Sequence, residues 1–271
     1  MFFSVLINSL CAQDSLQWEF VEEFSLPSFE QVRINPKGQI CLTQENGILI
    51  QLDKEGKEIA AFSPERTGEI TSLVTTNPLQ VFLFYAESQE YVILNRLLNP
   101  IKKSSFDDLN LSQNLDLGFV QFACPSTNNQ LWLVDNSDFS LKKYDAIHHN
   151  LEAQTALDLL LEGDFYALRS LQFYQNKLYL HAQDELLIFD PYGNYQQKIL
   201  IKNTNFLRFY EENFYFFDKE NQKVVFRNLY TNESKQISIP ADLREEILGV
   251  IYFDSSVYFF FQNSVKVFLC R

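Results

Sequence analysis

The sequence has 271 residues, of which 46% are hydrophobic and 15% aromatic, and it carries a formal net charge of −13. This composition excludes an intrinsically disordered chain, because it supplies ample apolar material for a packed core. The negative charge argues against binding to nucleic acid or to anionic lipid, since the Lys and Arg residues are scattered and form no basic stripe.

The first twelve residues are apolar and uncharged. They are typical of the core and cleavage end of a secretory signal peptide, although the usual basic start is missing. Cleavage after Ala12 predicts a signal peptide over residues 1–12 and a folded domain over residues 14–271. Lipidation at Cys11 is disfavoured because the bulky Leu10 precedes it. An apolar N-terminal strand is the alternative interpretation, and no later stretch is long enough to span a membrane.

A strand, a polar turn and a second strand then recur along the chain, and each unit closes with Asp or Asn. Gly, Asn or Pro punctuates the units where the backbone must reverse tightly. The closing residues are about 40 to 50 positions apart, which is the span of one four-stranded propeller blade. They are Asp53, Asn95, Asp145, Asp190 and Asn228.

Five complete blades and one incomplete blade follow in chain order. The complete blades span residues 30–62, 70–105, 119–155, 168–201 and 206–239. The last repeat, over residues 248–269, has three strands. Residues 17–24 alternate polar and apolar side chains, so we expect them to form the outer strand of the last blade and close the ring. The predicted fold class is all-β, a single β-propeller of six blades with four antiparallel strands each. Five or seven blades are the alternative counts.

Two long connections and a shorter one decorate a single face of this predicted propeller. They cover residues 105–117, 155–167 and 240–246, and we expect one or two helical turns within 156–161. In a propeller these connections lie on the same face as the turns between the second and third strands.

The connections are rich in carboxylates. We predict that these form an acidic face that binds a basic protein partner, because complementary charge steers association. Solvated loops that only aid solubility are the alternative. A calcium site is disfavoured because no Asp-x-Asp-x-Asp spacing occurs. The predicted partner-binding residues are Asp107, Asp108, Asp116, Asp158, Glu162, Asp164, Glu245 and Glu246.

The predicted inner strands offer no converging carboxylates or imidazoles. We therefore predict no catalytic, cofactor-binding or metal-binding residue, and no cofactor. Arg33, Gln172 and Arg208 fall at similar register on three inner strands. We expect them to pair with carboxylates between blades, and lining of the central channel is the alternative.

We predict structural roles for the His and Cys residues. His148 and His149 are neighbours in a turn and point apart, so a shared metal is disfavoured. His181 ends a strand and is expected to be structural. The cysteines at 41, 124 and 270 lie in predicted strands beside apolar residues, which favours buried thiols over a disulfide framework.

The strand rhythm and two Asp-x-x-Gly closings, Asp53-Lys54-Glu55-Gly56 and Asp190-Pro191-Tyr192-Gly193, resemble the six-bladed propellers found outside the cytoplasm, the NHL and TolB-like kind. This resemblance covers nearly all of the expected mature chain. Propellers of this kind in Gram-negative envelopes often serve as rigid docking subunits of outer-membrane assembly or secretion machines. The resemblance thus implies a periplasmic protein that associates with the outer membrane through a partner.

Three functional hypotheses follow. The first is a non-catalytic periplasmic propeller that docks onto an outer-membrane secretion or assembly complex through the acidic face. The second is a metal-dependent hydrolase or lyase with a site on the propeller axis. The third is a carbohydrate or peptide binder that uses exposed aromatic side chains at turn tips, namely Tyr192, Tyr195 and Tyr230.

Overall fold

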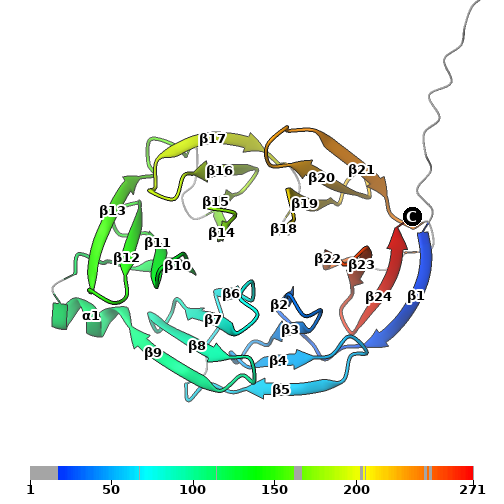
Figure 1. Cartoon of the computed structure of the whole chain (residues 1–271), viewed down its shortest axis with the longest axis horizontal. Coiled ribbons are helices and arrows are strands. Elements are labelled where there is room, and N and C mark those ends of the chain that lie inside the picture. Colours follow the sequence, from blue (N-terminus) through cyan, green and yellow to red (C-terminus); the bar gives the residue numbers. More distant parts are fainter. Residues whose placement is uncertain are drawn as a thin grey trace, which may run out of the picture.

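Six four-stranded antiparallel sheets stand in a ring around a central axis (Figure 1). The computed structural model describes residues 18–66, 68–113, 115–161, 167–201, 204, 206–240, 243 and 246–270. The predicted signal peptide over residues 1–12 lies outside these ranges. Within them, the predicted six-bladed β-propeller is confirmed.

Each blade runs from an inner strand beside the axis to an outer strand at the rim. Blade 1 holds β2 (Gln31–Ile34), β3 (Ile40–Thr43), β4 (Leu49–Leu52) and β5 (Glu58–Phe62). Blade 2 holds β6 (Ser72–Val74), β7 (Gln80–Tyr85), β8 (Glu90–Asn95) and β9 (Pro100–Ser105). Blade 3 holds β10 (Val120–Pro125), β11 (Gln130–Asp135), β12 (Ser140–Asp145) and β13 (Asn150–Ala156).

The second half of the ring repeats this arrangement. Blade 4 holds β14 (Leu168–Tyr174), β15 (Lys177–Ala182), β16 (Glu185–Phe189) and β17 (Tyr195–Leu200). Blade 5 holds β18 (Leu207–Tyr210), β19 (Asn213–Asp218), β20 (Lys223–Asn228) and β21 (Ser234–Ser238). Blade 6 holds β22 (Gly249–Phe253), β23 (Ser256–Phe260) and β24 (Ser264–Cys270), with β1 (Trp18–Ser25) as its outer strand.

The N-terminal strand closes the ring, as the alternating pattern predicts. β1 pairs antiparallel with β24, from Trp18 opposite Cys270 to Ser25 opposite Ser264. The Trp18 indole lies edge-on to Phe259 and donates a hydrogen bond of 2.7 Å to the Ser238 carbonyl of blade 5. The first and last described strands therefore share one sheet, which satisfies the edge that β24 would otherwise expose.

The closing Asp or Asn of each repeat has a defined structural role. Its Oδ1 accepts hydrogen bonds from backbone N–H groups two and three or four residues later, which holds the turn to the outer strand. Asp53 accepts from Glu55 and Lys57 at 3.1 and 2.8 Å. Asn95, Asp145, Asp190 and Asn228 make the same kind of paired contacts.

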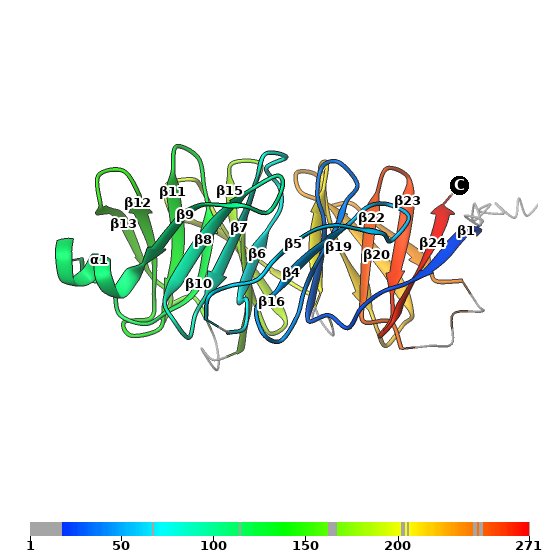
Figure 2. The same ribbon diagram turned by 90° about the horizontal axis from the view of Figure 1, so that it is seen from below.

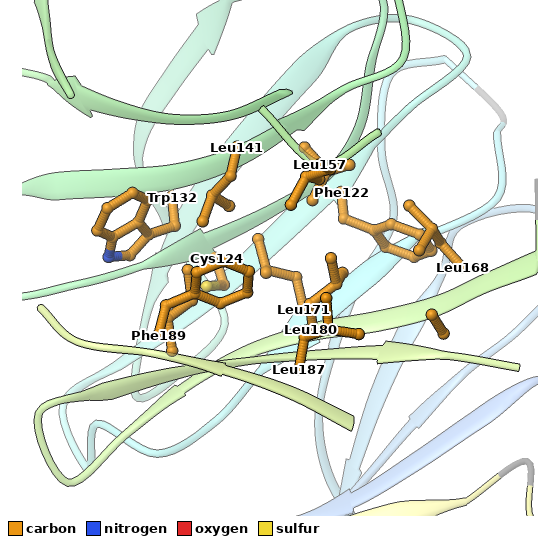
Figure 3. Packing of buried hydrophobic residues seen from close by; sticks show 13 residues of the cluster. Phe122, Cys124, Trp132, Leu141, Leu157, Leu168, Leu171, Leu180, Leu187 and Phe189 are labelled. Atoms are coloured by element: carbon orange, nitrogen blue, oxygen red, sulfur yellow. The ribbon is translucent and has the colours of Figure 1, made fainter. Parts of the chain in front are cut away.

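The hydrophobic core lies between neighbouring blades and leaves the axis unfilled. Figure 3 shows the cluster between blades 3 and 4, where Trp132 and Phe189 are fully buried among leucines. Cys124 lies in this cluster and Cys41 is also buried, and both are free thiols as predicted. Burying each such large side chain stabilises the fold by about 1.5–3 kcal/mol.

The helix of the structure is at a different place from the predicted one. α1 (Phe106–Gln113) follows β9. The stretch over 156–161, where one or two helical turns are predicted, holds a single turn, in which the N–H groups of Leu160 and Leu161 donate to the Leu157 carbonyl at 3.0 and 3.1 Å. β13 instead extends to Ala156, and a turn follows it. The N-terminus of α1 is capped by Ser105, whose Oγ accepts from the Asp108 N–H at 3.3 Å. Ser followed by an acidic residue three positions later is the signal that sequence reasoning overlooked.

Candidate functional site

The long connections and the turns between second and third strands lie on one face, as predicted. We call this side the connection face, and Figure 2 shows it edge-on. Phe106 N–H bonds to the Gln89 carbonyl at 2.8 Å, and Asn136 N–H bonds to the Phe119 carbonyl at 2.8 Å. These bonds join each connection to the turn of a blade beside it. The other turns make the opposite face, where the Leu229 N–H bonds to Glu212 at 2.8 Å.

Four of the predicted partner-binding carboxylates surround blade 3. Asp107 and Asp108 are exposed in the first turn of α1, which projects from the rim of the ring (Figure 1). Asp116 is exposed in the connection that leads into β10, and Asp158 is exposed in the turn after β13. The two helical carboxylates also face the positive end of the helix dipole, which stabilises α1.

Of the other predicted acidic residues, only Glu246 lies within the described ranges, and it is apart from this group. Glu246 lies in the connection between blades 5 and 6, across the ring from α1, and pairs with Lys219 at 3.7 Å. Glu162, Asp164 and Glu245 lie outside the described residues. Four of the described carboxylates thus lie around blade 3, and the fifth, Glu246, lies apart from them beside blade 6.

Exposed apolar side chains accompany the acidic group, and sequence reasoning missed them. Leu111 and Leu159 are 87% and 86% exposed, and Phe119 and Phe139 are 46% and 39% exposed. Backbone hydrogen bonds place Phe119 beside the turn of Asn136, and Phe139 beside the residue after Ala156. We call these four side chains and the four carboxylates the blade 3 patch: Asp107, Asp108, Leu111, Asp116, Phe119, Phe139, Asp158 and Leu159.

A buried charge cluster fixes the backbone beneath the blade 3 patch. Lys142 Nζ lies 2.9 Å from Asp135 and 2.8 Å from Asp138, and it donates to the Asp116 carbonyl at 2.7 Å. The side chains of Lys142 and Asp135 are 2% and 0% exposed. Burial alone would lower the pKa of Lys142, but the hydrogen bonds from its ammonium to the two carboxylates raise the pKa above its ordinary value. The cluster holds the Asp116 segment against blade 3 as a rigid support.

The second candidate site is the central channel, which contains a cavity of ≈ 510 Å³. Inner strands of all six blades line it. The lining includes three of the eight arginines of the chain, namely Arg33, Arg169 and Arg208, together with one acidic residue, Glu211. Half-buried aromatic side chains surround the mouth on the opposite face, at the ends of β14, β18 and β22.

The prediction that Arg33 and Arg208 pair with carboxylates is wrong. Arg33 Nη1 donates to the Val32 carbonyl at 2.9 Å, and Arg208 Nη2 donates to the same oxygen at 3.2 Å. In the described part of the chain, neither guanidinium has a carboxylate within 4.0 Å. Gln172 also lines the channel and bonds weakly to the Leu207 carbonyl at 3.4 Å. The two arginines therefore point toward the axis, where the blades supply neutral acceptors.

Histidine and cysteine are not gathered for metal binding in the described ranges, which contain no group of three or more His, Cys, Asp or Glu side chains that could hold an ion. His148 Nδ1 pairs with Asp145 at 2.9 Å, whereas His149 Nδ1 meets the Tyr144 hydroxyl at 2.7 Å, so the neighbouring rings have separate partners. His181 is 1% exposed, and burial lowers its pKa to about 4.

The aromatic side chains predicted at turn tips are exposed on the opposite face. Tyr192, Tyr195 and Tyr230 are 73%, 40% and 59% exposed. The Tyr230 hydroxyl donates to Gln175 at 2.6 Å, which joins blade 5 to blade 4. This contact gives Tyr230 a structural role between blades.

Comparison with known proteins defines the class through the fold alone. The chain matches the β-propeller domain of Cps50 (Swd1) from Myceliophteria thermophila with a TM-score of 0.62 and 9% identity, over 94% of this chain and 100% of that one. It matches catalytically inactive virginiamycin B lyase from Staphylococcus aureus with a TM-score of 0.61 and 9% identity, again over 94% and 100%. The protein is a six-bladed β-propeller, and these matches define its fold and no family.

A third match is weaker. BamB from Moraxella catarrhalis aligns with a TM-score of 0.46 and 12% identity, over 89% of this chain and 69% of that one, and we base no argument on it. No protein-family model and no curated protein matches the sequence. Among the described residues, no helix has the length and apolar character needed to cross a membrane. The matched propellers include a lyase and the Cps50 (Swd1) domain, and propellers host many unrelated functions, so the fold does not decide the function of this protein.

Proposed function

We propose that this propeller is a non-catalytic docking subunit that binds a protein partner through the blade 3 patch. We further propose that it works in the periplasm, as an accessory subunit of an outer-membrane secretion or assembly complex. The observation that carries the docking proposal is the joint exposure of apolar and acidic side chains around one blade, next to the only helix of the described residues.

Apolar exposure supports a binding role for this patch. A leucine that is 87% exposed on a helix and another that is 86% exposed in a turn leave apolar surface in water. Scattered single residues of this kind are ordinary, whereas an apolar cluster within a polar rim is characteristic of protein interfaces, and we infer such a cluster from the shared position of these side chains around blade 3. Covering Leu111 and Leu159 with a partner would stabilise the complex by about 25 cal/mol for each Å² of apolar surface removed from water.

The charge of the patch specifies the chemistry of the partner. Four carboxylates flank the apolar side chains, and Lys142 beneath them is buried and already paired with Asp135 and Asp138. We infer that the patch has a negative potential. A partner with Lys or Arg around an apolar centre would be steered to it and would fit its pattern.

The test is capture of partners from native membranes by the tagged protein in mild detergent, followed by quantitative mass spectrometry. The variant carries Asp107→Lys, Asp108→Lys and Asp158→Lys. Because these side chains are exposed, the variant should keep the propeller fold, and the two reversed charges in the first turn of α1 should weaken that helix by about 0.3–1 kcal/mol each. We expect a near-stoichiometric partner with the unaltered protein and roughly tenfold less of it with the variant, since like charges would now face each other.

A matched control reverses three exposed carboxylates on the opposite face. Glu55→Lys, Glu212→Lys and Glu233→Lys change the net charge by the same amount and leave the blade 3 patch intact. This control should capture the partner as the unaltered protein does. Equal capture by both variants, or equal loss in both, would contradict the proposed docking surface.

Export is a separate part of the proposal and rests on the apolar segment over residues 1–12. N-terminal sequencing of the protein from its native cells should give a mature chain that starts after Ala12, and fractionation should place it in the periplasm. A cytoplasmic protein that retains residues 1–12 would contradict this part without affecting the docking surface.

The non-catalytic part of the proposal is supported by the chemistry of the channel lining, which is mostly aromatic, aliphatic and hydroxyl side chains with three Arg and a single carboxylate, Glu211. A hydrolase or lyase with an axial metal needs a set of ligands there. Metal analysis after gentle purification should find less than one divalent ion per chain. A stoichiometric ion would favour the enzyme.

A further inference from the structure

Two guanidinium groups meet in the central channel, and among the described residues no carboxylate pairs with them. Arg33 comes from β2 of blade 1 and Arg208 from β18 of blade 5, and both side chains are half-buried. Because both donate to the Val32 carbonyl, at 2.9 and 3.2 Å, the two donor nitrogens lie no farther apart than the sum of these distances. Like charges this close destabilise each other unless an anion is shared between them.

The groups around the arginines do not supply that anion. Tyr215 of β19 acts electrostatically on both arginines, Cys41 of β3 acts on Arg33, and the buried His181 of β15 interacts with Arg208. Burial raises the pKa of Cys41 to about 12 and also raises the pKa of Tyr215, so both are neutral near pH 7. Glu211 lies in the turn after β18 with its side chain exposed, and within the described residues it forms no ion pair.

Most of the hydrogen-bonding capacity of the pair is unused. A guanidinium carries five N–H donors. Within the described residues, Arg33 makes one hydrogen bond to the protein and Arg208 makes two, the second of these to the Leu207 carbonyl at 2.7 Å. The Arg208 Nε is buried without a partner, as is the hydroxyl of Ser72 in the same lining. Buried donors without acceptors are costly, and a bound acceptor would relieve this cost.

Arg208 is nevertheless held firmly in place. Its guanidinium lies 3.8 Å from the centre of the Phe206 ring, which is a cation–π contact, and two carbonyls fix its orientation. Burial, together with the positive charge of Arg33, lowers its pKa well below the ordinary value, and burial lowers the pKa of Arg33 to about 10. A guanidinium stays protonated in proteins, so the channel presents a preorganised pair of cations.

The walls above the arginines are aromatic. Tyr210 and Tyr252 lie edge to face with ring centres 5.0 Å apart, and Tyr174 stacks on Phe209 at 5.1 Å. All four line the cavity and are half-buried. A cavity of ≈ 510 Å³ falls within the range of roughly 300–1,000 Å³ that is typical of small-molecule sites, and it is far larger than an inorganic anion requires.

We propose that the central channel binds a small organic anion, whose carboxylate or phosphate lies on Arg33 and Arg208 and whose flat apolar body lies against the aromatic side chains. The planar fork of a guanidinium matches both acid groups, so the chemistry shared by the two ligand classes is an oxyanion on an aromatic or apolar body. This site is separate from the blade 3 patch and does not depend on the docking proposal.

Calorimetric titration of the whole protein at low salt tests the proposal with three probes of one shape. These are 2-naphthoate, 2-naphthyl phosphate and the neutral 2-naphthalenemethanol. At least one anion should bind about tenfold or more tightly than the alcohol, because charge-assisted hydrogen bonds add to the apolar contacts. A preference for one anion identifies the acid group. The proposal is overturned when neither anion binds more tightly than the alcohol.

Variants assign the binding to the arginine pair. Arg33→Gln and Arg208→Gln should each weaken binding of the preferred anion about tenfold or more and leave binding of the alcohol nearly unchanged. Arg96→Gln is the matched control, because Arg96 is exposed in the turn between β8 and β9, away from the channel. Unchanged anion binding in both channel variants would overturn the assignment.

A measurement on the unaltered protein keeps the test decisive if a channel variant fails to fold. A crystal grown with 6-bromo-2-naphthoate should show the anomalous signal of bromine in the channel beside Tyr210 and Tyr252, with the carboxylate toward Arg33 and Arg208. Bromine found only outside the channel would refute the site.

Discussion

Replacing Lys142 with Met removes the ammonium that neutralises Asp135 at the base of blade 3. Met has a similar length and no charge, so the substitution isolates the electrostatic contribution from the packing contribution. The side chains of Lys142 and Asp135 are 2% and 0% exposed, and their atoms lie 2.9 Å apart. Asp135 would then be a carboxylate buried without its cation.

The cost follows from this burial. Removing one partner of a buried ion pair destabilises a protein by about 3–5 kcal/mol. We expect the lower end, about 3 kcal/mol, because Asp135 keeps two hydrogen bonds, from the N–H groups of Gly118 at 2.7 Å and Ser137 at 2.9 Å. The free energy of unfolding of a folded domain is usually about 5–15 kcal/mol, so a loss of about 3 kcal/mol is a large fraction of it and is easily measured.

Urea unfolding followed by tryptophan fluorescence measures the effect, since Trp132 is fully buried in the same blade. The matched control is Lys103→Met. Lys103 also pairs with two carboxylates, Glu90 at 3.4 Å and Glu65 at 3.5 Å, but its side chain is 43% exposed. Solvent screens these surface pairs, so the control should lose no more than about 1 kcal/mol.

A double-variant cycle separates charge from shape. Adding Asp135→Asn to Lys142→Met removes the unpaired charge, so the double variant should be more stable than the sum of the two single losses implies. Equal losses from Lys142→Met and Lys103→Met, or purely additive losses in the cycle, would refute the argument that burial makes this cluster strong.

Three further predictions concern the turns. Asp53→Ala should destabilise the protein by about 1–2 kcal/mol in urea unfolding, because two backbone N–H groups lose their acceptor; Asp53→Asn, which keeps Oδ1, should lose much less. The hydrogen bond to Asp145 raises the pKa of His148 above 6.5, and the pKa of Asp145 is lowered to about 2 by its hydrogen bonds to His148. The stability that His148 contributes is therefore present below pH 6.5 and is lost as the pH rises through its raised pKa. The stability that Asp145 contributes is lost as the pH falls toward 2. NMR titration should show a lower His148 pKa in Asp145→Asn, and an unchanged pKa would contradict the pairing. Gly56→Ala should destabilise the protein and make β1 sensitive to proteases. The reason is that Gly56 has φ +81° and a Cβ there would overlap the Phe24 ring. Unchanged resistance to proteases would show that this contact does not hold the closing strand.

The blades could be predicted from the sequence because each repeat carries its own local signals. The closing Asp53 and its equivalents accept hydrogen bonds from residues only a few positions ahead, so the feature is local and recurs before the outer strands of blades 1 to 5. The alternation in residues 17–24 was enough to place β1 at the rim, because a strand left over at one end must pair with the blade that lacks one. The turns and the strand alternation each depend on a few consecutive residues, so the sequence alone is enough to predict them.

The sites could not be predicted in the same way because they depend on distant contacts. Arg208 donates to Val32, 176 positions away, and no local pattern shows that the blades between them supply no carboxylate. The exposure of Leu111 and Leu159 depends equally on what the neighbouring blades leave uncovered. The helix at Phe106–Gln113 has a local signal, the capping residue Ser105. The apolar run over 156–161 gave a stronger helical pattern, so the helix was predicted there.

Site-specific photo-cross-linking in native cells tests the docking claim most directly. Benzoylphenylalanine is placed at Leu111 and at Leu159 of the blade 3 patch, and at Tyr192, which is 73% exposed on the opposite face. We predict that the first two positions give a cross-link to the same protein and that Tyr192 gives none to it. A partner captured equally from Tyr192, or no cross-link from either leucine position, would contradict the assignment of the blade 3 patch as the docking surface.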